Sequence, residues 1–350
     1  MNRVVHAVFP VDLKSDTVTK PSPEMRRAMY EAEVGDDVYG EDPTVVRLEE
    51  AAAGILGMEA ALFMPSGTMG NLAAVLTHCG RGDALILGAG SHMQNFEGGG
   101  VAALGSAVPL LADDSSGCIP PEEVRAHCRP SNVHFAPARL LCLENTHNRM
   151  GGLASSPERI RASADEARRH GLAVHIDGAR IFNAATAWGC RAADFASSVD
   201  SVQFCLSKGL GAPVGSVLCG RRDFVDTARH WRKRLGGGMR QAGVLAAAGL
   251  YALEHNIGRL EEDHENAALL ADLLSAGDVI MVERNDKPTN MVYCTVPDGV
   301  GEDLHVRCAA RGVLFNAVAD GRFRLVTHLD VSTEQVKAAA AVILEEAAAS

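Results

Sequence analysis

The sequence predicts an α/β fold in which helices cover both faces of a mostly parallel sheet, followed by a smaller α+β domain. Short apolar runs alternate along the chain with segments of helical periodicity, and strands that are apolar throughout are typical of parallel sheets buried on both faces. The chain has 350 residues, whereas a single hydrophobic core stops growing at ~250–300 residues. We therefore expect two domains.

The first part of the chain supplies two helices and three strand candidates. Residues 43–56 predict a helix, because Asp42 is a suitable N-cap and Gly57 follows the apolar stripe. A second helical run follows the turn PSGTMGN at 65–71 and extends through Leu76. The strand candidates are ALFM at 61–64, ALIL at 84–87 and LLCLE at 140–144.

The middle of the chain repeats this alternation. Residues 157–170 predict a helix that begins after Ser156 and ends before Gly171. Further strand candidates are AVHID at 173–177, SVQFCLS at 201–207 and VGSVLCG at 214–220. Ligands of open α/β sheets bind at the carboxyl ends of the strands. The loops after ALFM, LLCLE, AVHID and VQFCLS should therefore line one crevice.

A glycine-rich break, GGGMRQAG at 236–243, precedes one more helical run, and beyond it the alternation loosens. Strands and helices of a small α+β unit are expected at 291–296, 302–311, 323–328 and from Ser332 onward. Ser332 and Gln335 have the spacing of a capping box. The expected domains are 1–254, an N-terminal arm with the large domain, and 255–350, the small domain.

Composition argues against several classes of protein. A formal net charge of −11 suggests no basic face for nucleic acid. Nine cysteines without a CxxC pair favour a reducing compartment over a disulfide framework or a structural zinc site. No apolar stretch reaches the ~18 residues of a membrane span, and MNRVVHAVFPVD lacks the features of a secretion signal. We expect a cytoplasmic protein with no membrane and no nucleic-acid partner.

The turn at 65–71 could hold an anion. Gly67 allows close approach to a ligand, Thr68 offers a hydroxyl, and the free N–H groups of the following helix point to the same place. The alternative is an ordinary turn. The segment is not a Walker A loop, because no GKS or GKT follows. A second glycine-containing segment, GAGSHM at 88–93, has GxG but lacks the third Gly or Ala of a Rossmann fingerprint.

Two charged residues follow neighbouring strand candidates. Asp177 ends AVHID and Lys208 follows SVQFCLS, so both should face the crevice. Asp177 could instead cap a turn, and Lys208 could reach past the end of its strand to solvent. An anion cradle, an acid and a lysine together are what pyridoxal phosphate (PLP) needs: the amine bonds its aldehyde and the acid keeps its ring nitrogen protonated.

These features resemble those of the low-specificity L-threonine aldolases, which are PLP-dependent enzymes of fold type I in the aspartate aminotransferase superfamily. The resemblance runs through nearly the whole chain. It implies a large domain with a mostly parallel seven-stranded sheet. The segments that carry it are DLKSDTVTKPSPEMRRAM (12–29), VGDDVYGEDPT (34–44), ALFMPSGTMGN (61–71), SH (91–92), LENTHNR (143–149), VHIDGARIFNA (174–184), FCLSKGLGAPVGS (204–216), GGGMRQAGVLAAAG (236–249) and RLVTH (324–328).

The resemblance implies a role for several residues at the cofactor. Lys208 would bond the cofactor covalently and Asp177 would bind its ring nitrogen. Arg180 would lie near the ring hydroxyl, His92 would stack on the ring, and Arg240 would reach the phosphate of a neighbouring subunit. The phosphate in the subunit's own site would be held by Gly67, Thr68 and Ser207. No metal is implied.

The resemblance also implies the residues that hold the substrate. Ser15 and Arg324 would grip its carboxylate, with Arg180 nearby, and His147 would approach its hydroxyl. Simpler interpretations remain: Ser15 as a helix cap, Arg180 as part of an ion pair, and His92 and His147 as core histidines. His175, His255 and His264 are expected to be structural, and the run Arg232, Lys233 and Arg234 is expected to form a solvated face.

The activity that the resemblance implies is retro-aldol cleavage of L-threonine or L-allo-threonine to glycine and an aldehyde, in threonine catabolism and glycine biosynthesis. His92, His147 or a water could take the hydroxyl proton. A β-eliminating lyase or an amino-acid racemase would need the same cradle, acid and lysine, and a non-catalytic binding protein could keep the fold. The stereochemical preference at Cβ and the physiological direction stay open. The chain is expected to form at least a dimer, and by resemblance a homotetramer built as a dimer of dimers.

Overall fold

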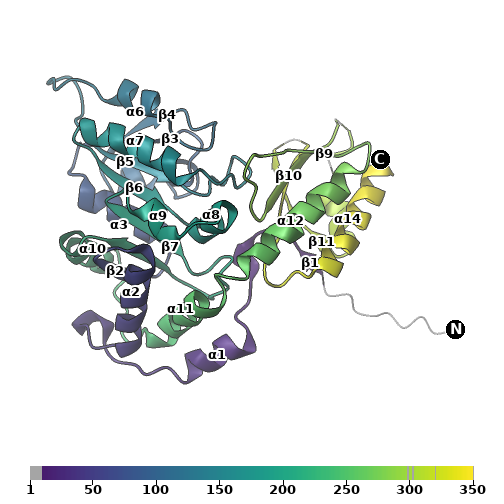
Figure 1. The fold of residues 1–350 in the computed structure, drawn as a ribbon, viewed down its shortest axis with the longest axis horizontal. Helices are drawn as coiled ribbons and strands as arrows, with labels where there is room; N and C mark the ends of the chain where they lie inside the picture. The colour runs from purple at the N-terminus through teal and green to yellow at the C-terminus, as the bar shows by residue number, and fades with distance from the viewer. Residues whose placement is uncertain (1–9, 298, 302, 320, 350) are drawn as a thin grey trace.

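A seven-stranded sheet organises the larger lobe of the computed structural model, which describes residues 10–297, 299–301, 303–319 and 321–349 (Figure 1). The strand order is β2-β8-β7-β6-β5-β3-β4. Strand β8 runs in the opposite direction to the other six strands, so the sheet is mostly parallel, as predicted. The strands are β2 (Ala60–Met64), β3 (Ala84–Gly88), β4 (Val108–Ala112), β5 (Ala138–Glu144), β6 (Ala173–Asp177), β7 (Ser201–Cys205) and β8 (Ser216–Gly220).

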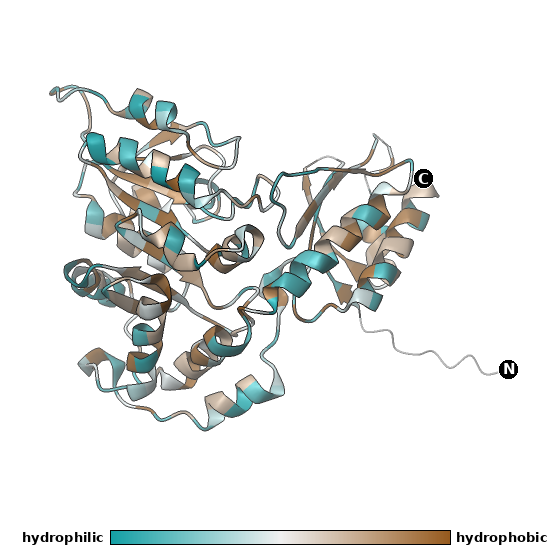
Figure 2. Ribbon diagram, in the orientation of Figure 1, coloured by the Kyte–Doolittle hydropathy of each residue, from teal (hydrophilic) through white to brown (hydrophobic). Residues whose placement is uncertain are grey.

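Helices cover both faces of this sheet. Alternate strand residues point to opposite faces: Phe63 of β2 joins one apolar cluster, and Leu62 and Met64 join another. The helices on the Phe63 face are α2 (Pro43–Leu56), α6 (Pro121–His127), α7 (Pro157–Arg169), α8 (Ile181–Trp188), α9 (Ala192–Ala196) and α11 (Gly243–His255), and on the other face α3 (Gly67–His78), α5 (Gly100–Ala103) and α10 (Arg222–Arg234). Hydropathy colouring shows the strands mostly brown and the helices as a mixture of teal and brown residues (Figure 2).

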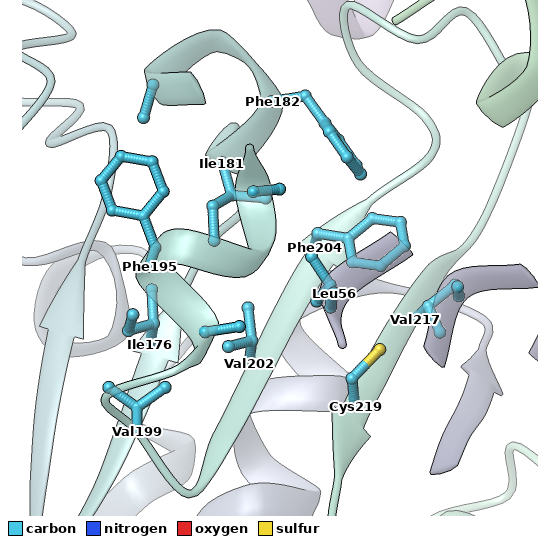
Figure 3. Packing of buried hydrophobic residues seen from close by; sticks show 14 of the residues in the cluster. Leu56, Ile176, Ile181, Phe182, Phe195, Val199, Val202, Phe204, Val217 and Cys219 are labelled. Atoms are coloured by element: carbon cyan, nitrogen blue, oxygen red, sulfur yellow. The ribbon is translucent and has the colours of Figure 1, made fainter. Parts of the chain in front are cut away.

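Aromatic rings fill the core between the sheet and α8. Phe182 of α8 meets Phe204 of β7 edge to face, with ring centroids 5.2 Å apart, beside Phe195 and Ile181 (Figure 3). Such pairs are favourable beyond the area that they bury. This packing fixes α8 over β6 and β7, the two strands that end at Asp177 and just before Lys208.

One strand of the sheet, β4, was not among the strands identified from the sequence. Its segment VPLLA contains Pro109, which has no N–H to donate to a sheet. In the structure β4 pairs only with β3, at the edge of the sheet, where a proline can be accommodated.

The smaller lobe is an α+β unit, as predicted. An antiparallel sheet of order β12-β13-β10-β9 packs on helices α12, α13 and α14. Ser332 and Gln335 form the predicted capping box at the start of α14. The strands are β9 (Met281–Val282), β10 (Met291–Thr295), β12 (Asn316–Ala319) and β13 (Arg322–Val326), and the helices α12 (Leu260–Ser275), α13 (Leu304–Ala310) and α14 (Thr333–Ala348).

The N-terminal segment joins the smaller lobe. Strand β1 (Val11–Asp12) pairs in parallel with β11 (Val313–Leu314), and Leu13 lies in that lobe's apolar cluster. The chain then enters the larger lobe through η1 (Asp16–Val18), α1 (Pro23–Tyr30) and η2 (Asp37–Tyr39). The division at residue 255 stays a prediction. The expectation that the N-terminus is not a secretion signal concerns mainly residues 1–9, which lie outside the described residues.

The prediction that residues 232–234 form a solvated face is wrong for Arg232. Arg232 is only 2% exposed; it donates to the carbonyl of Phe63 and forms an ion pair with Asp37 at 2.8 Å. A buried arginine is tolerated when its charge is paired. Lys233 and Arg234 are exposed, as expected. Within the described residues, every helix is too short or too polar to cross a bilayer.

Candidate active site

A cavity of about 250 Å³ opens at the carboxyl ends of β2, β6 and β7. Strands β2 and β7 both run antiparallel to β8, so their carboxyl ends lie on the same side. The predicted crevice is therefore present. Its lining includes six of the residues singled out from the sequence: Gly67, Thr68, His92, Asp177, Ser207 and Lys208.

The N-terminus of α3 forms one wall of this cavity. Ser66 caps the helix, and its hydroxyl accepts from the N–H of Met69. The N–H groups of Gly67 and Thr68 precede that bonded donor, so they are free to meet an anion. A Cβ on Gly67 would lie only 3.0 Å from the Sγ of Cys205, so the wall tolerates no larger residue without movement.

Asp177 and Lys208 face the same space. Asp177 is 2% exposed; one carboxylate oxygen accepts from the N–H of Ala179 at 3.1 Å and the other from the Asn71 amide at 2.9 Å. Lys208 is half-buried, and its carbonyl accepts from the Thr19 hydroxyl at 3.2 Å. The site thus combines a held carboxylate with an amine.

His92 is paired with Glu97, a residue that the sequence reasoning did not identify. The Nδ1 of His92 lies 2.9 Å from the Oε1 of Glu97. Burial works against the charged form of His92, but the hydrogen bond to Glu97 and the negative charges of Asp177 and Glu97 together outweigh it and raise the histidine pKa. Burial also raises the pKa of Glu97. The acid five residues after His92 in SHMQNFE was the available signal, because the short helix α4 (His92–Asn95) folds it back.

Arg180 lies in a buried ion pair beside the cavity. Its Nε and Nη2 donate to the two carboxylate oxygens of Asp16 at 2.7 and 2.6 Å. Burial alone would raise the pKa of Asp16, but the charge and hydrogen bonds of Arg180 overcome it and lower this pKa to about 2. Arg180 does not line the cavity. Its contacts in the structure match the simpler interpretation, in which Arg180 is part of an ion pair.

His147 lies behind the cavity and is only 1% exposed. Its Nε2 is 2.7 Å from Asp114, whose carboxylate also accepts from the N–H of Gly90. Burial opposes protonation of His147, yet the hydrogen bond to Asp114 raises its pKa. The structure therefore does not bring His147 to the cavity wall, and its proposed contact with a substrate hydroxyl stays a prediction.

A second, larger cavity of about 690 Å³ shares His92 with the first and contains Arg324. Arg324 donates to the Asn148 side chain at 3.1 Å and to the Lys14 carbonyl at 3.2 Å. Its Nε is buried and has no hydrogen-bond partner in the part of the chain that the structure describes. Residues of both lobes line this space, which suits a small anionic ligand.

Two other predicted residues lie outside both cavities. Ser15 caps η1, and its hydroxyl accepts from the N–H of Thr17 at 3.2 Å. Arg240 is on the surface, with 57% of its side chain exposed, and pairs with Asp36 at 3.0 Å. His175 is fully buried and hydrogen-bonded, as expected for a structural residue.

The first cavity fits the chemistry of PLP. A helix N-terminus suits a phosphate, a buried carboxylate suits a protonated ring nitrogen, and an amine can bond an aldehyde. The buried Oε1 of Gln203, on the cavity wall, has no hydrogen-bond partner among the described residues and is free to accept one. The imidazole of His92 and the carboxylates of Glu97 and Asp177 also lie within 4.8 Å of one another, so the absence of a metal stays a prediction.

Comparisons with known proteins identify relatives along most of the chain. The model of the β-eliminating lyase family matches residues 12–297. A low-specificity L-threonine aldolase of Escherichia coli K12 is 49% identical, covering 95% of this chain and 97% of its own. Another from Arabidopsis thaliana is 46% identical, with 93% of each chain covered. The solved structure of a Leishmania major threonine aldolase superposes with a TM-score of 0.84 at 19% identity, covering 97% of this chain and all of its own.

Proposed function

The chain belongs to the β-eliminating lyase family, and on this premise we propose that it is a PLP-dependent aldolase acting on L-threonine, L-allo-threonine and related β-hydroxy-α-amino acids. It cleaves their Cα–Cβ bond and releases glycine and an aldehyde. The observation that carries the proposal is that Lys208, Asp177 and the N-terminus of α3 line one cavity. The substrate class comes from the named activity of relatives that are 46–49% identical.

Each residue at the first cavity has a defined part in holding the cofactor. Lys208 provides the amine that bonds its aldehyde, and Asp177 keeps its ring nitrogen protonated. His92 would stack on the ring. Arg180, which Asp16 holds beside the cavity, would interact with the ring hydroxyl. The phosphate is bound by Gly67, Thr68 and Ser207.

The larger cavity holds the substrate. The planar guanidinium of Arg324 suits a carboxylate, and its unpartnered Nε gives it a donor to spare. PLP, when bound, supplies an electron sink for the electron pair of the bond that breaks. Holding the carboxylate at Arg324 orients that bond, and orientation of this kind lowers the barrier. Ser15, which caps η1 outside both cavities, would have to approach the carboxylate to share this contact.

A base must take the proton of the substrate hydroxyl. His92 lines both cavities and is 34% exposed, so its Nε2 can accept a proton while Nδ1 is bonded to Glu97. His147 or a water are the other candidates. His147 would need a movement of its loop to reach the substrate, because its ring is buried against Asp114.

Borohydride reduction of the PLP-loaded protein tests the central assignment. We expect a cofactor adduct on the peptide that contains Lys208, detected by mass spectrometry. Lys208→Ala should form no adduct and should not turn over threonine, whereas Lys337→Ala, at an exposed position of α14, should behave as the wild type. An adduct on another lysine, or full activity of Lys208→Ala, would overturn the proposal.

Product analysis separates the aldolase from its rivals in the same family. Acetaldehyde and glycine from threonine support the aldolase. Ammonia and a keto acid would indicate β-elimination, and inverted amino acid alone would indicate a racemase. Rates on threonine and allo-threonine measured side by side would give the preference at Cβ.

We further propose a cytoplasmic homotetramer, a dimer of dimers, that works in threonine catabolism and glycine biosynthesis. The nine cysteines are all unbridged, and seven of them are buried, which favours a reducing compartment. Arg240 is exposed on the surface, which is compatible with the contact to the phosphate of a second copy that the resemblance implies. Sedimentation analysis gives the assembly. Arg240→Ala should weaken PLP binding only if this residue crosses the interface.

A further inference from the structure

A chain of hydrogen bonds leads away from the cavity behind Asp177. The Nδ2 of Asn71 donates to Asp177 at 2.9 Å, and the Oδ1 of Asn71 is 3.1 Å from the Nε2 of His175. The Nδ1 of His175 is 2.9 Å from the hydroxyl of Ser201, which is 2.9 Å from the Nε2 of His78. The chain thus crosses α3, β6 and β7 beneath the site.

The proton positions in this chain follow from its two ends. Asn71 accepts through its amide oxygen, so His175 must carry its proton on Nε2 and accept on Nδ1. Ser201 then donates to His175, and its oxygen is left to accept from His78. Burial lowers the pKa of His175 to about 3 and that of His78 to about 4, so both rings are neutral at pH 7.

Asn71 joins two carboxylates. Its Nδ2 donates to Glu97 at 2.8 Å as well as to Asp177, and both acids are almost completely buried. If the side-chain amide of Asn71 flipped, its oxygen would face two carboxylates. The N–H of His175 prevents this flip, because it bonds the oxygen on the other side.

We propose that Asn71 and His175 are positioning residues that fix the orientation of the Asp177 carboxylate toward the ring nitrogen of the cofactor. His175 does not line the cavity, so it acts only through Asn71. The inference rests on the role proposed for Asp177, and it is independent of which reaction the cofactor supports.

Substitutions of His175 test the inference by cofactor spectroscopy. His175→Leu removes the donor to Asn71, whereas the amide of His175→Gln can supply one from about the same place. The PLP dissociation constant and the pH at which the visible band of the bound cofactor titrates are measured for each. We expect His175→Leu to weaken PLP about tenfold and to move the titration to higher pH, because a ring nitrogen without its proton withdraws less charge. His175→Gln should stay within about threefold of the wild type.

Stability and two further variants make the test decisive. A purely structural role would lower the free energy of unfolding but leave the titration pH of the folded holoenzyme unchanged, and that result would overturn the inference. An equal shift in His175→Gln and His175→Leu would overturn it too. If His175→Leu does not fold, Ser201→Ala decides: a shift in the same direction supports the inference and a wild-type titration overturns it. Asp177→Asn must also shift the band, since otherwise the role of Asp177 fails and the inference with it.

Discussion

Two buried arginine–aspartate pairs differ in how well they are bonded. Arg180 reaches both oxygens of Asp16, at 2.7 and 2.6 Å, and the pKa of Asp16 falls despite its burial. Arg232 meets Asp37 at 2.8 Å, yet burial outweighs this attraction and raises the pKa of Asp37. A bidentate pair repays the loss of hydration better than a single contact does. The pair that holds Arg180 is therefore the one expected to stabilise the site.

Asp16→Asn should destabilise the protein by about 3–5 kcal/mol at pH 7, because it leaves Arg180 buried without a counter-ion. The pKa of Asp16 is lower in the folded state than its ordinary value of 3.8. Its contribution is therefore complete above pH 4 and is lost as pH falls toward about 2. Urea unfolding as a function of pH should show that the difference in free energy of unfolding between the wild type and Asp16→Asn becomes smaller below about pH 4.

Asp223→Asn is the matched control for this experiment. Asp223 pairs with Arg221, but both side chains are about 70% exposed, so solvent screens the pair and the loss of stability should be much smaller than for Asp16→Asn. A gap for Asp16→Asn that stays constant down to pH 2.5, or that is no larger than the control's, would count against the argument.

At the scale of elements, helix α3 serves both the sheet and the site. Its first turn faces the cavity, while its next turn packs so closely on β7 that only glycine fits there. A Cβ on Gly70 would lie 2.7 Å from the Cγ of Gln203. Gly54 in α2 is the opposite case, because a Cβ there would have no heavy atom within 4 Å.

These two glycines predict opposite effects of the same substitution. Gly54→Ala should raise the free energy of unfolding by about 0.5–1 kcal/mol, since alanine is the better helix former and the site is open. Gly70→Ala should lower it by about 1–3 kcal/mol through overpacking against β7. Thermal and urea unfolding of the two variants measure both effects, and a stabilised Gly70→Ala would mean that α3 can move away from the sheet.

At the scale of the whole molecule, the larger cavity, where the substrate is proposed to bind, exists only because two lobes meet. Arg324 lies on β13 of the smaller lobe and bonds Asn148, which follows β5 of the larger one. The Lys14 carbonyl that it also bonds belongs to the N-terminal segment. The residues proposed to contact the cofactor belong to the larger lobe, so binding of cofactor and of substrate should respond separately to mutation.

Arg324→Lys should lower kcat/KM for threonine about 10–100-fold, mainly through KM, because lysine keeps the charge but loses the planar pair of donors. The PLP dissociation constant should not change. Arg311→Lys, at a partly exposed ion pair of the same lobe, should stay within about twofold of the wild type. Loss of PLP binding in Arg324→Lys would contradict the separate roles of the two cavities.

The sequence by itself determined the elements whose signals are local. Helix α2 has the predicted bounds of 43–56, because an N-cap and a terminal glycine act within one turn of the chain. The strands ending near Asp177 and Lys208 were identified for the same reason, and the carboxyl-end rule placed both residues at one crevice. The positions of Gly67 and Thr68 at the same crevice were predicted in the same way, because their loop follows an apolar strand.

Only the tertiary structure decided which polar groups far apart in the sequence would pair. No local sequence pattern predicts that Asn71, His175 and Ser201 bond one another. None predicts that Arg232 pairs with Asp37. The edge position of β4 and the pairing of β1 with β11 likewise depend on strands more than 20 residues away. A buried polar group is stable only with a partner, and the partner is chosen by how elements pack, which no local pattern records.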